Sequence, residues 1–152
     1  MKIKTVATFA LLAFVLAGVV VLVAKEWKRS EGVVASSPLR GSMVVAYYFH
    51  GNVRCVSCVK IEALSRKAVA EGFPEEIKSG RLEFREVNVD EPRYRHFINE
   101  YRLSSQSLVV VQVRDGRQVR WKNLEKVWTL LDSESEFISY VRDGVSGFLE
   151  SA

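Results

Sequence analysis

Hydrophobic residues form one long run near the start of the chain and recur at short periods after it. From Thr5 to Ala24, twenty consecutive residues carry no charge. A helix of that length spans about 30 Å, the thickness of the hydrocarbon core of a bilayer. Lys2 and Lys4 precede the run and Trp27 follows it, where an interfacial aromatic residue would lie. The pattern predicts an uncleaved membrane anchor over residues 1–29, because the apolar region of a cleaved signal peptide is usually only about 7–15 residues long.

A tether and a domain follow the predicted anchor. Residues 30–42, SEGVVASSPLRGS, are mostly small and predict a short linker. Residues 43–152 form the predicted domain. Basic residues lie on both sides of the apolar run, so their distribution does not decide the orientation. A very short basic N-terminus is typical of an export signal-anchor. We therefore expect the domain on the extracytoplasmic side of a single-pass protein.

The first half of the domain predicts a strand, a helix and a second strand. Residues 43–50, MVVAYYFH, are β-branched and aromatic, as in a buried strand. From Cys58 onward apolar residues recur at helical spacing, and this helix ends near residues 72–74, Gly-Phe-Pro. Residues 81–89 predict the second strand. Its apolar residues change face halfway along, which indicates a bulge or burial on both faces, as in a central parallel strand.

The second half of the domain predicts three helices and a hairpin. The expected elements are a helix over residues 94–101, strands over 108–113 and 118–121, and helices over 124–131 and 133–148. Asp90-Glu91-Pro92 is a signal for the start of the first helix. Asp115-Gly116 marks the hairpin turn, and Ser133 with Glu136 forms a capping box. A strand–helix–strand crossover makes a parallel pair and a hairpin an antiparallel one, so we expect an α/β fold with a mixed sheet flanked by helices.

Composition and charge narrow the function classes. Hydrophobic residues make up 48% of the 152 residues and charged residues 26%, which excludes a disordered chain. The net charge is +4, but residues 1–42 hold six basic and two acidic side chains, which leaves sixteen of each in residues 43–152. A domain with balanced charge is not expected to bind nucleic acid. Two cysteines are too few for a disulfide-dense secreted scaffold.

Both cysteines belong to one motif, Cys55-Val56-Ser57-Cys58, between a predicted strand and a predicted helix. At the start of a helix the first sulfur lies beside unpaired backbone N–H groups and the positive end of the helix dipole. These stabilise the thiolate and lower the pKa of the leading cysteine, which makes Cys55 a nucleophile. Cys58 lies one turn further along and is placed to resolve a mixed disulfide. Arg54 adds positive charge beside Cys55, unless it is simply solvated.

The order of elements and the CxxC motif resemble the thioredoxin-like fold over residues 43–142. The strings YYFHGNVRCVSCVKIEAL, VNVDEP followed by RHF, and RWKNLEKVW resemble a thioredoxin-like family encoded beside arsenic-resistance genes, named "nitrophenyl compound nitroreductase subunit ArsF". The resemblance implies a dithiol–disulfide protein with Cys55 and Cys58 as its redox pair. It also implies a redox partner protein and an arsenical efflux or nitroreductase partner. The sequence holds no GxGxxG or other cofactor fingerprint, so we expect no cofactor and no nitroreduction by this chain alone.

The sequence departs from the thioredoxin pattern at three places. Thioredoxins carry a cis-proline just before the third core strand, and the corresponding segment here, SSQSLVVV around Ser107, has no proline. Arg54 stands where thioredoxins usually have tryptophan, and the apolar, aromatic run AYYF replaces the buried acid beneath the cysteines. The missing proline puts the docking of peptide substrates in doubt and predicts sulfurs that are less shielded from a metal.

Binding of a soft metal is the alternative function. Two thiolates with His50 would suit Cu(I) or a trivalent arsenical, which accept two or three ligands. Structural zinc needs four ligands, and His50 and His96 lie at spacings that match no zinc finger. Each other candidate also has a simpler reading: His50 as the last residue of a strand, and His96 and Glu62 as exposed helix residues, although Glu62 could relay protons one turn after Cys58.

Overall fold

The structure, a computed structural model, describes residues 41–151. The predicted anchor over residues 5–24, and the tether up to residue 40, lie outside the described residues. Within residues 41–151 no helix is both long enough and apolar enough to span a bilayer.

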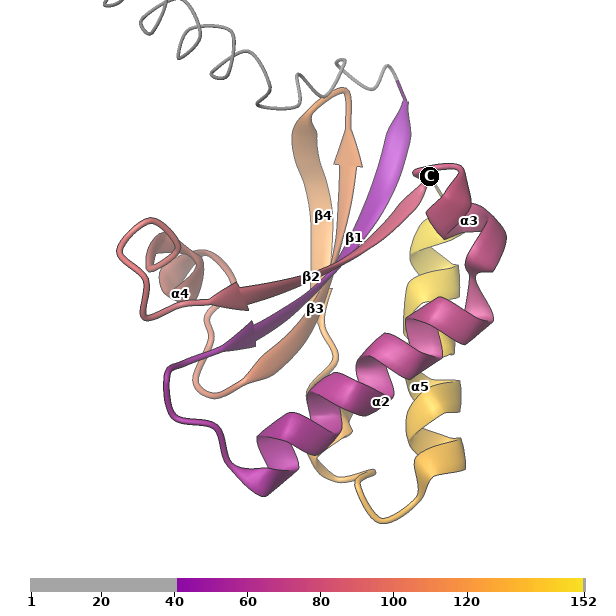
Figure 1. The fold of residues 1–152 in the computed structure, drawn as a ribbon. Helices are drawn as coiled ribbons and strands as arrows, with labels where there is room; N and C mark the ends of the chain where they lie inside the picture. Colours follow the sequence, from indigo (N-terminus) through magenta and orange to yellow (C-terminus); the bar gives the residue numbers. More distant parts are fainter. Residues whose placement is uncertain (1–40, 152) are drawn as a thin grey trace, which may run out of the picture. The chain divides into compact units, whose positions relative to one another are not determined.

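A mixed four-stranded sheet forms the centre of the described domain (Figure 1). Strand β1 (Ser42–His50) pairs in parallel with β2 (Leu82–Asn88) and antiparallel with β3 (Ser107–Arg114). Strand β4 (Arg117–Asn123) pairs antiparallel with β3, which gives the strand order β2-β1-β3-β4. The turn between β3 and β4 has positive φ at Asp115 and Gly116, 51° and 76°, as a two-residue hairpin of type I′ requires. The predicted mixed sheet and hairpin are confirmed.

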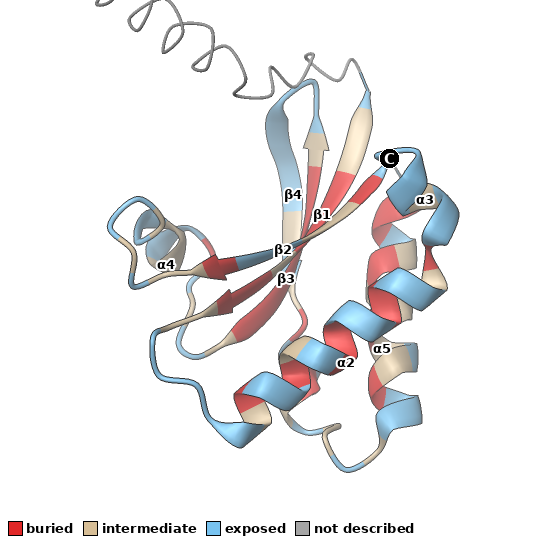
Figure 2. Ribbon diagram, in the orientation of Figure 1, coloured by how far each residue is buried: buried red, intermediate tan, exposed pale blue. Residues whose placement is uncertain are grey.

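Helices cover both faces of the sheet. Helix α2 (Val56–Gly72) and helix α5 (Glu134–Leu149) pack against one face, and the short helix α4 (His96–Glu100) lies over the other (Figure 1). The buried residues of α2 and α5 line the sides that face the sheet (Figure 2). Two short elements, α3 (Pro74–Lys78) and the 3₁₀ turn η1 (Glu125–Trp128), complete the layers.

Alternation along β1 explains why residues 43–49 of the strand are all apolar or aromatic. Val44, Ala46 and Tyr48 belong to the core beneath α2 and α5, while Phe49 and the partly buried Tyr47 belong to the core beneath α4. Successive side chains of a strand point to opposite faces, so a strand covered on both faces needs apolar residues at every position. The predicted buried strand is confirmed.

Strand β2 is buried on both faces, which confirms one of the two predicted explanations, but it is not a central strand. It is an edge strand, and its register with β1 runs without interruption from Leu82 to Asn88, so there is no bulge. Leu82 and Phe84 contact the core beneath α2, whereas Val87 joins the core beneath α4. The change of phase therefore reflects burial of the two ends of one edge strand on opposite faces.

Two predicted helices are much shorter than expected. The helix expected over residues 94–101 is only α4, five residues long, after a series of turns. The helix expected over residues 124–131 is the 3₁₀ turn η1. Leu124, the first apolar residue of this segment, directly follows β4 and extends its pairing with β3, because its backbone N–H donates to the Leu108 oxygen at 2.8 Å. Helix α5 begins as predicted: Ser133 is its N-cap, and the Glu136 N–H donates to the Ser133 hydroxyl.

Two tyrosines of strand β1 and one at the end of helix α4 predict a loss of stability at alkaline pH. Burial raises the pKa of Tyr47, Tyr48 and Tyr101 above the ordinary value. The folded protein therefore holds these phenol protons more tightly than the unfolded chain. Their contribution to stability is complete below about pH 10 and is lost as the pH rises above it. Urea unfolding between pH 8 and 11 should show the midpoint falling above pH 10, and a flat profile would contradict this.

Candidate functional site

The two cysteines form a disulfide at the start of helix α2. Their Cα atoms are 5.0 Å apart, and Cys55 is the N-cap residue of the helix. Cys55 is exposed, whereas Cys58 is 2% exposed and faces the core. The motif therefore lies where the sequence places it, and the two sulfurs are unequally accessible to a second molecule.

The Cys55 sulfur occupies the position of a helix-capping oxygen. It accepts the backbone N–H of Cys58 at 3.1 Å. The first turn of α2 holds no acidic residue to offset the positive end of the helix dipole. A thiolate released at Cys55 by reduction would be stabilised by this N–H and by the dipole. Arg54, which precedes it, forms an ion pair with Glu62, so part of its charge is neutralised.

Tyr48, in the aromatic run AYYF, lies beneath the first turn of helix α2. Its side chain is fully buried, and its hydroxyl donates a hydrogen bond of 2.6 Å to the carbonyl oxygen of Cys58. Burial raises the pKa of Tyr48, and the charge of Arg54 opposes that rise. The phenol therefore stays protonated at neutral pH and acts as a hydrogen-bond donor. It fastens the first turn of α2 to strand β1.

Asp90 holds the loop that leads into the motif and does not cap a helix, which corrects the prediction. Its Oδ2 accepts the backbone N–H of Asn52 at 2.7 Å, and the Asn88 side-chain amide donates to Asn52 Oδ1 at 2.8 Å. A Cβ atom on Gly51 would lie 2.9 Å from Asp90 Oδ2, so a side chain at position 51 would push the Asp90 carboxylate away. The string VNVDEP thus positions the loop before Cys55.

Gln106 lies in the segment where thioredoxins carry the cis-proline. Residues 41–151 contain no cis peptide bond. The Gln106 side-chain amide donates to the backbone oxygen of Val53 at 3.3 Å, and its own backbone oxygen accepts the Trp128 indole N–H at 2.9 Å. The segment before β3 is therefore joined to the CxxC loop by a side chain. Sequence reasoning missed Gln106, since an isolated glutamine among serines gives no signal of its own.

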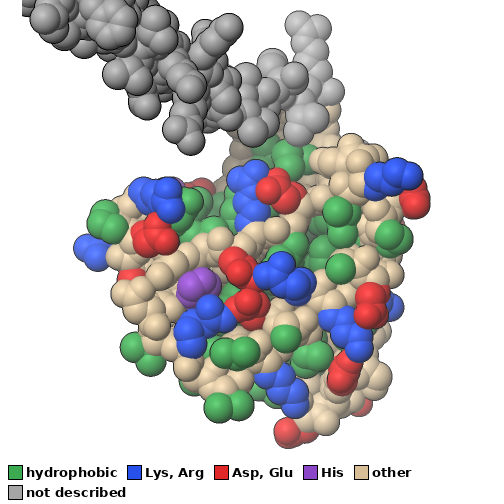
Figure 3. Space-filling view, viewed as in Figure 1, with side chains coloured by type: hydrophobic (Ala, Val, Ile, Leu, Met, Phe, Trp, Pro, Cys, Tyr) green, Lys and Arg blue, Asp and Glu red, His purple; other side chains and the backbone are tan. Residues whose placement is uncertain are grey.

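The other candidates do not join the cysteines. The His50 ring N–H donates to the Gly51 oxygen at 2.9 Å, and no group of three His, Cys, Asp or Glu side chains within residues 41–151 is placed to hold a metal. Glu62 pairs with Arg54 and with Arg66, so it is a partly buried ion-pair residue. His96 is exposed, as expected. Basic and acidic side chains lie next to one another on the face shown in Figure 3.

The order of the strands and the helices around them define a thioredoxin-like fold. The strand order is β2-β1-β3-β4, and β3 is antiparallel to β1. Helix α2 follows the central strand β1 directly along the chain. The CxxC disulfide lies at the start of that helix.

Comparison with solved structures returns thioredoxins at low identity. The thioredoxin of Fasciola hepatica is 19% identical, with a TM-score of 0.41 over 70% of this chain and 81% of that one. Trxlp from Edwardsiella tarda is 20% identical, with a TM-score of 0.39 over 68% and 84%. The reduced Schistosoma mansoni thioredoxin pre-protein is 17% identical, with a TM-score of 0.38 over 79% and 90%. No protein-family model and no curated protein sequence matches the chain, so its resemblance to the arsenic-associated family stays a prediction.

Proposed function

We propose that this chain is a thiol–disulfide oxidoreductase or electron relay that uses Cys55 and Cys58. The observation that carries the proposal is the asymmetry of the disulfide: Cys55 is an exposed residue whose sulfur caps helix α2, and Cys58 is buried one turn along. A nucleophile must reach its substrate, and a resolving thiol must reach only the nucleophile.

The reaction moves two electrons. In the reduced protein the Cys55 thiolate attacks one sulfur of a substrate disulfide, forms a mixed disulfide and releases the first substrate thiolate. The Cys58 thiolate then attacks the Cys55 sulfur, closes the internal disulfide and releases the second substrate thiolate. Two protons from the solvent neutralise the released thiolates at neutral pH. The substrate is reduced and the protein oxidised, so each cycle needs a dithiol partner as electron donor.

The proposal extends to the place where this reaction occurs and to the partner of the protein. An anchor over residues 5–24 would hold the domain at a membrane, on the extracytoplasmic side, where the pair needs a dedicated electron donor. The resemblance to the arsenic-associated family favours a partner in arsenical or nitroaromatic detoxification. A soft-metal site would use the same dithiol, but no group of three His, Cys, Asp or Glu side chains within residues 41–151 is placed to hold a metal. The redox function is therefore the better supported.

Redox cycling of the full-length chain in detergent tests the proposed function. We expect dithiothreitol to expose two alkylatable thiols, with Cys55 modified much faster than Cys58 at neutral pH. The reduced protein should then accelerate reduction of a protein disulfide such as that of insulin. A double Cys55→Ser, Cys58→Ser variant is the control. Stoichiometric binding of As(III) or Cu(I) without any cycling would overturn the redox function and favour the metal alternative.

A further inference from the structure

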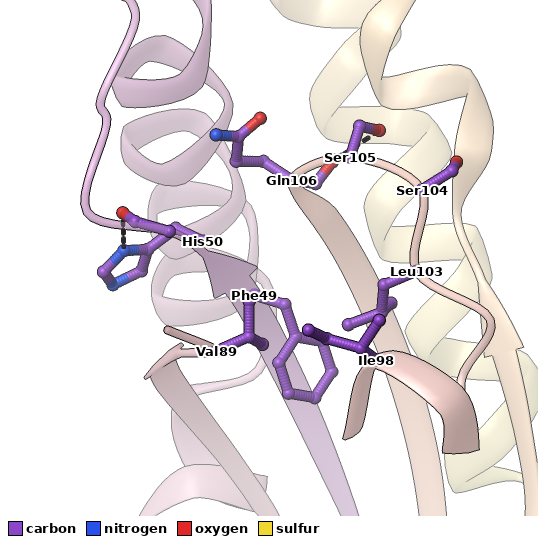
Figure 4. Close-up of a pocket in the computed structure, with 9 residues that line it drawn as sticks. Phe49, His50, Val89, Ile98, Leu103, Ser104, Ser105 and Gln106 are labelled. Carbon is purple, nitrogen blue, oxygen red and sulfur yellow. Dashed lines mark hydrogen bonds between the residues drawn. The ribbon is translucent and has the colours of Figure 1, made fainter. Parts of the chain in front are cut away.

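A cavity of about 400 Å³ opens at the ends of strands β1 and β2 (Figure 4). It is lined by residues of β1, of the segment after β2, of α4 and of the segment before β3. Its volume lies within the range of small ligand sites, about 300–1,000 Å³. The carboxyl ends of adjacent parallel strands are also where α/β proteins place their ligand sites. The cavity is thus large enough for one aromatic or branched aliphatic group.

The lining of the cavity is apolar on one side and polar on the other. Phe49, Val89, Ile98 and Leu103 gather on one side in Figure 4, and Gln106 lies across from them. No Asp, Glu, Lys or Arg side chain lines it. Burying a charged group here would leave the charge without a partner, which is costly. The site therefore suits an uncharged group whose apolar surface contacts the Phe49 side.

Gln106 links the cavity to the disulfide. It lines the cavity, and its side-chain amide donates to the oxygen of Val53, two residues before Cys55. The Trp128 indole holds the backbone of Gln106 in place. The other wall, at His50 and Gly51, is the start of the loop that runs into the motif. The cavity therefore borders, on two sides, the loop that carries Cys55.

We propose that this cavity is a specificity subsite for an uncharged aromatic or branched aliphatic group carried next to the substrate's disulfide. The proposal rests on the proposed function and names its substrate class. Such a group arises either from a side chain of a partner protein or from a small organic disulfide. In both cases the apolar group enters between Phe49 and Gln106 while the substrate sulfur meets Cys55.

Steady-state kinetics with two series of disulfides test the subsite. The first series consists of cystine peptides that differ only in Phe, Ser or Asp beside the cysteine. The second consists of small disulfides of matched thiol acidity, one with a phenyl group and one with a hydroxyl. We expect the full-length chain to show a KM about tenfold lower for the apolar member of at least one series, since burial of such a group favours binding by that order. A preference in one series alone identifies the source of the group.

Two variants and a control separate the subsite from a general loss of activity. Ile98→Ser should remove most of the preference through KM, with kcat for the Ser peptide nearly unchanged, and Gln106→Ala should remove the preference as well. Ile77→Ser, in a separate hollow beside α3, should keep the preference. Equal KM values for all members of both series, from a protein that still cycles, would overturn the subsite alone. A protein that reduces none of the disulfides would overturn the proposed function and the subsite with it.

Discussion

A Cys58→Ser variant is expected to accumulate as a covalent complex with its substrate through Cys55. The exposed Cys55 sulfur still attacks, but no second thiol remains to close the internal disulfide. Resolution then depends on an external thiol. In the native chain the resolving thiol is three residues away and has a high effective concentration. Without it, release of the substrate from Cys55 should slow by about a hundredfold or more. Non-reducing electrophoresis and mass spectrometry of the trapped complex measure this.

Matched variants of the same motif make the trapping specific. Cys55→Ser should trap nothing, because Cys58 is buried and out of reach of a second protein. Ser57→Ala lies in the same turn of α2 and removes no sulfur, so it should cycle as the native chain does. Equal trapping by Cys55→Ser and Cys58→Ser would contradict the assignment of Cys55 as nucleophile.

The sequence predicts the parts of this fold in which periodicity and burial coincide. Strand β1, helix α2 and the capped helix α5 each bury a continuous apolar face, and their predicted positions agree with the structure. The hairpin turn is correctly predicted because an Asp-Gly pair strongly favours the two positive φ angles that this turn requires, here at Asp115 and Gly116. The residues around the CxxC motif are sufficient to predict that it lies at the start of a helix. In each case the local sequence pattern and the tertiary packing favour the same secondary structure.

The sequence-based prediction is wrong where a local pattern is explained by a contact with a distant segment of the chain. Asp90 matches the pattern of a helix cap, yet its carboxylate accepts the backbone N–H of Asn52, which lies 38 positions earlier in the sequence. The apolar residues at 124–131 resemble a helix, yet Leu124 continues the ladder with β3. Gln106 reaches the Val53 oxygen from a segment 53 positions away. Contacts between distant segments leave no period along the chain, so only the folded structure reveals them.

Replacing Tyr48 by alanine is the structural change with the largest expected effect near the site. The ring is fully buried in the core beneath α2, so its removal leaves a cavity that should cost about 3–5 kcal/mol of unfolding free energy, as for other large-to-small aromatic changes. The loss includes the hydrogen bond to the Cys58 oxygen. Urea unfolding of the oxidised protein measures it.

The Tyr48→Phe variant separates the hydroxyl from the ring. It keeps the packing and removes only the 2.6 Å hydrogen bond to the Cys58 oxygen, so we expect a cost of about 1 kcal/mol. If that bond fastens the first turn of α2, the cost comes with faster hydrogen exchange of amides in that turn and with a changed equilibrium between dithiol and disulfide. Tyr140→Phe on α5 is a control, because it also removes a phenol hydroxyl but lies on another element. Equal effects of the two variants on the dithiol–disulfide equilibrium would show that Tyr48 supports only the core and does not position Cys58.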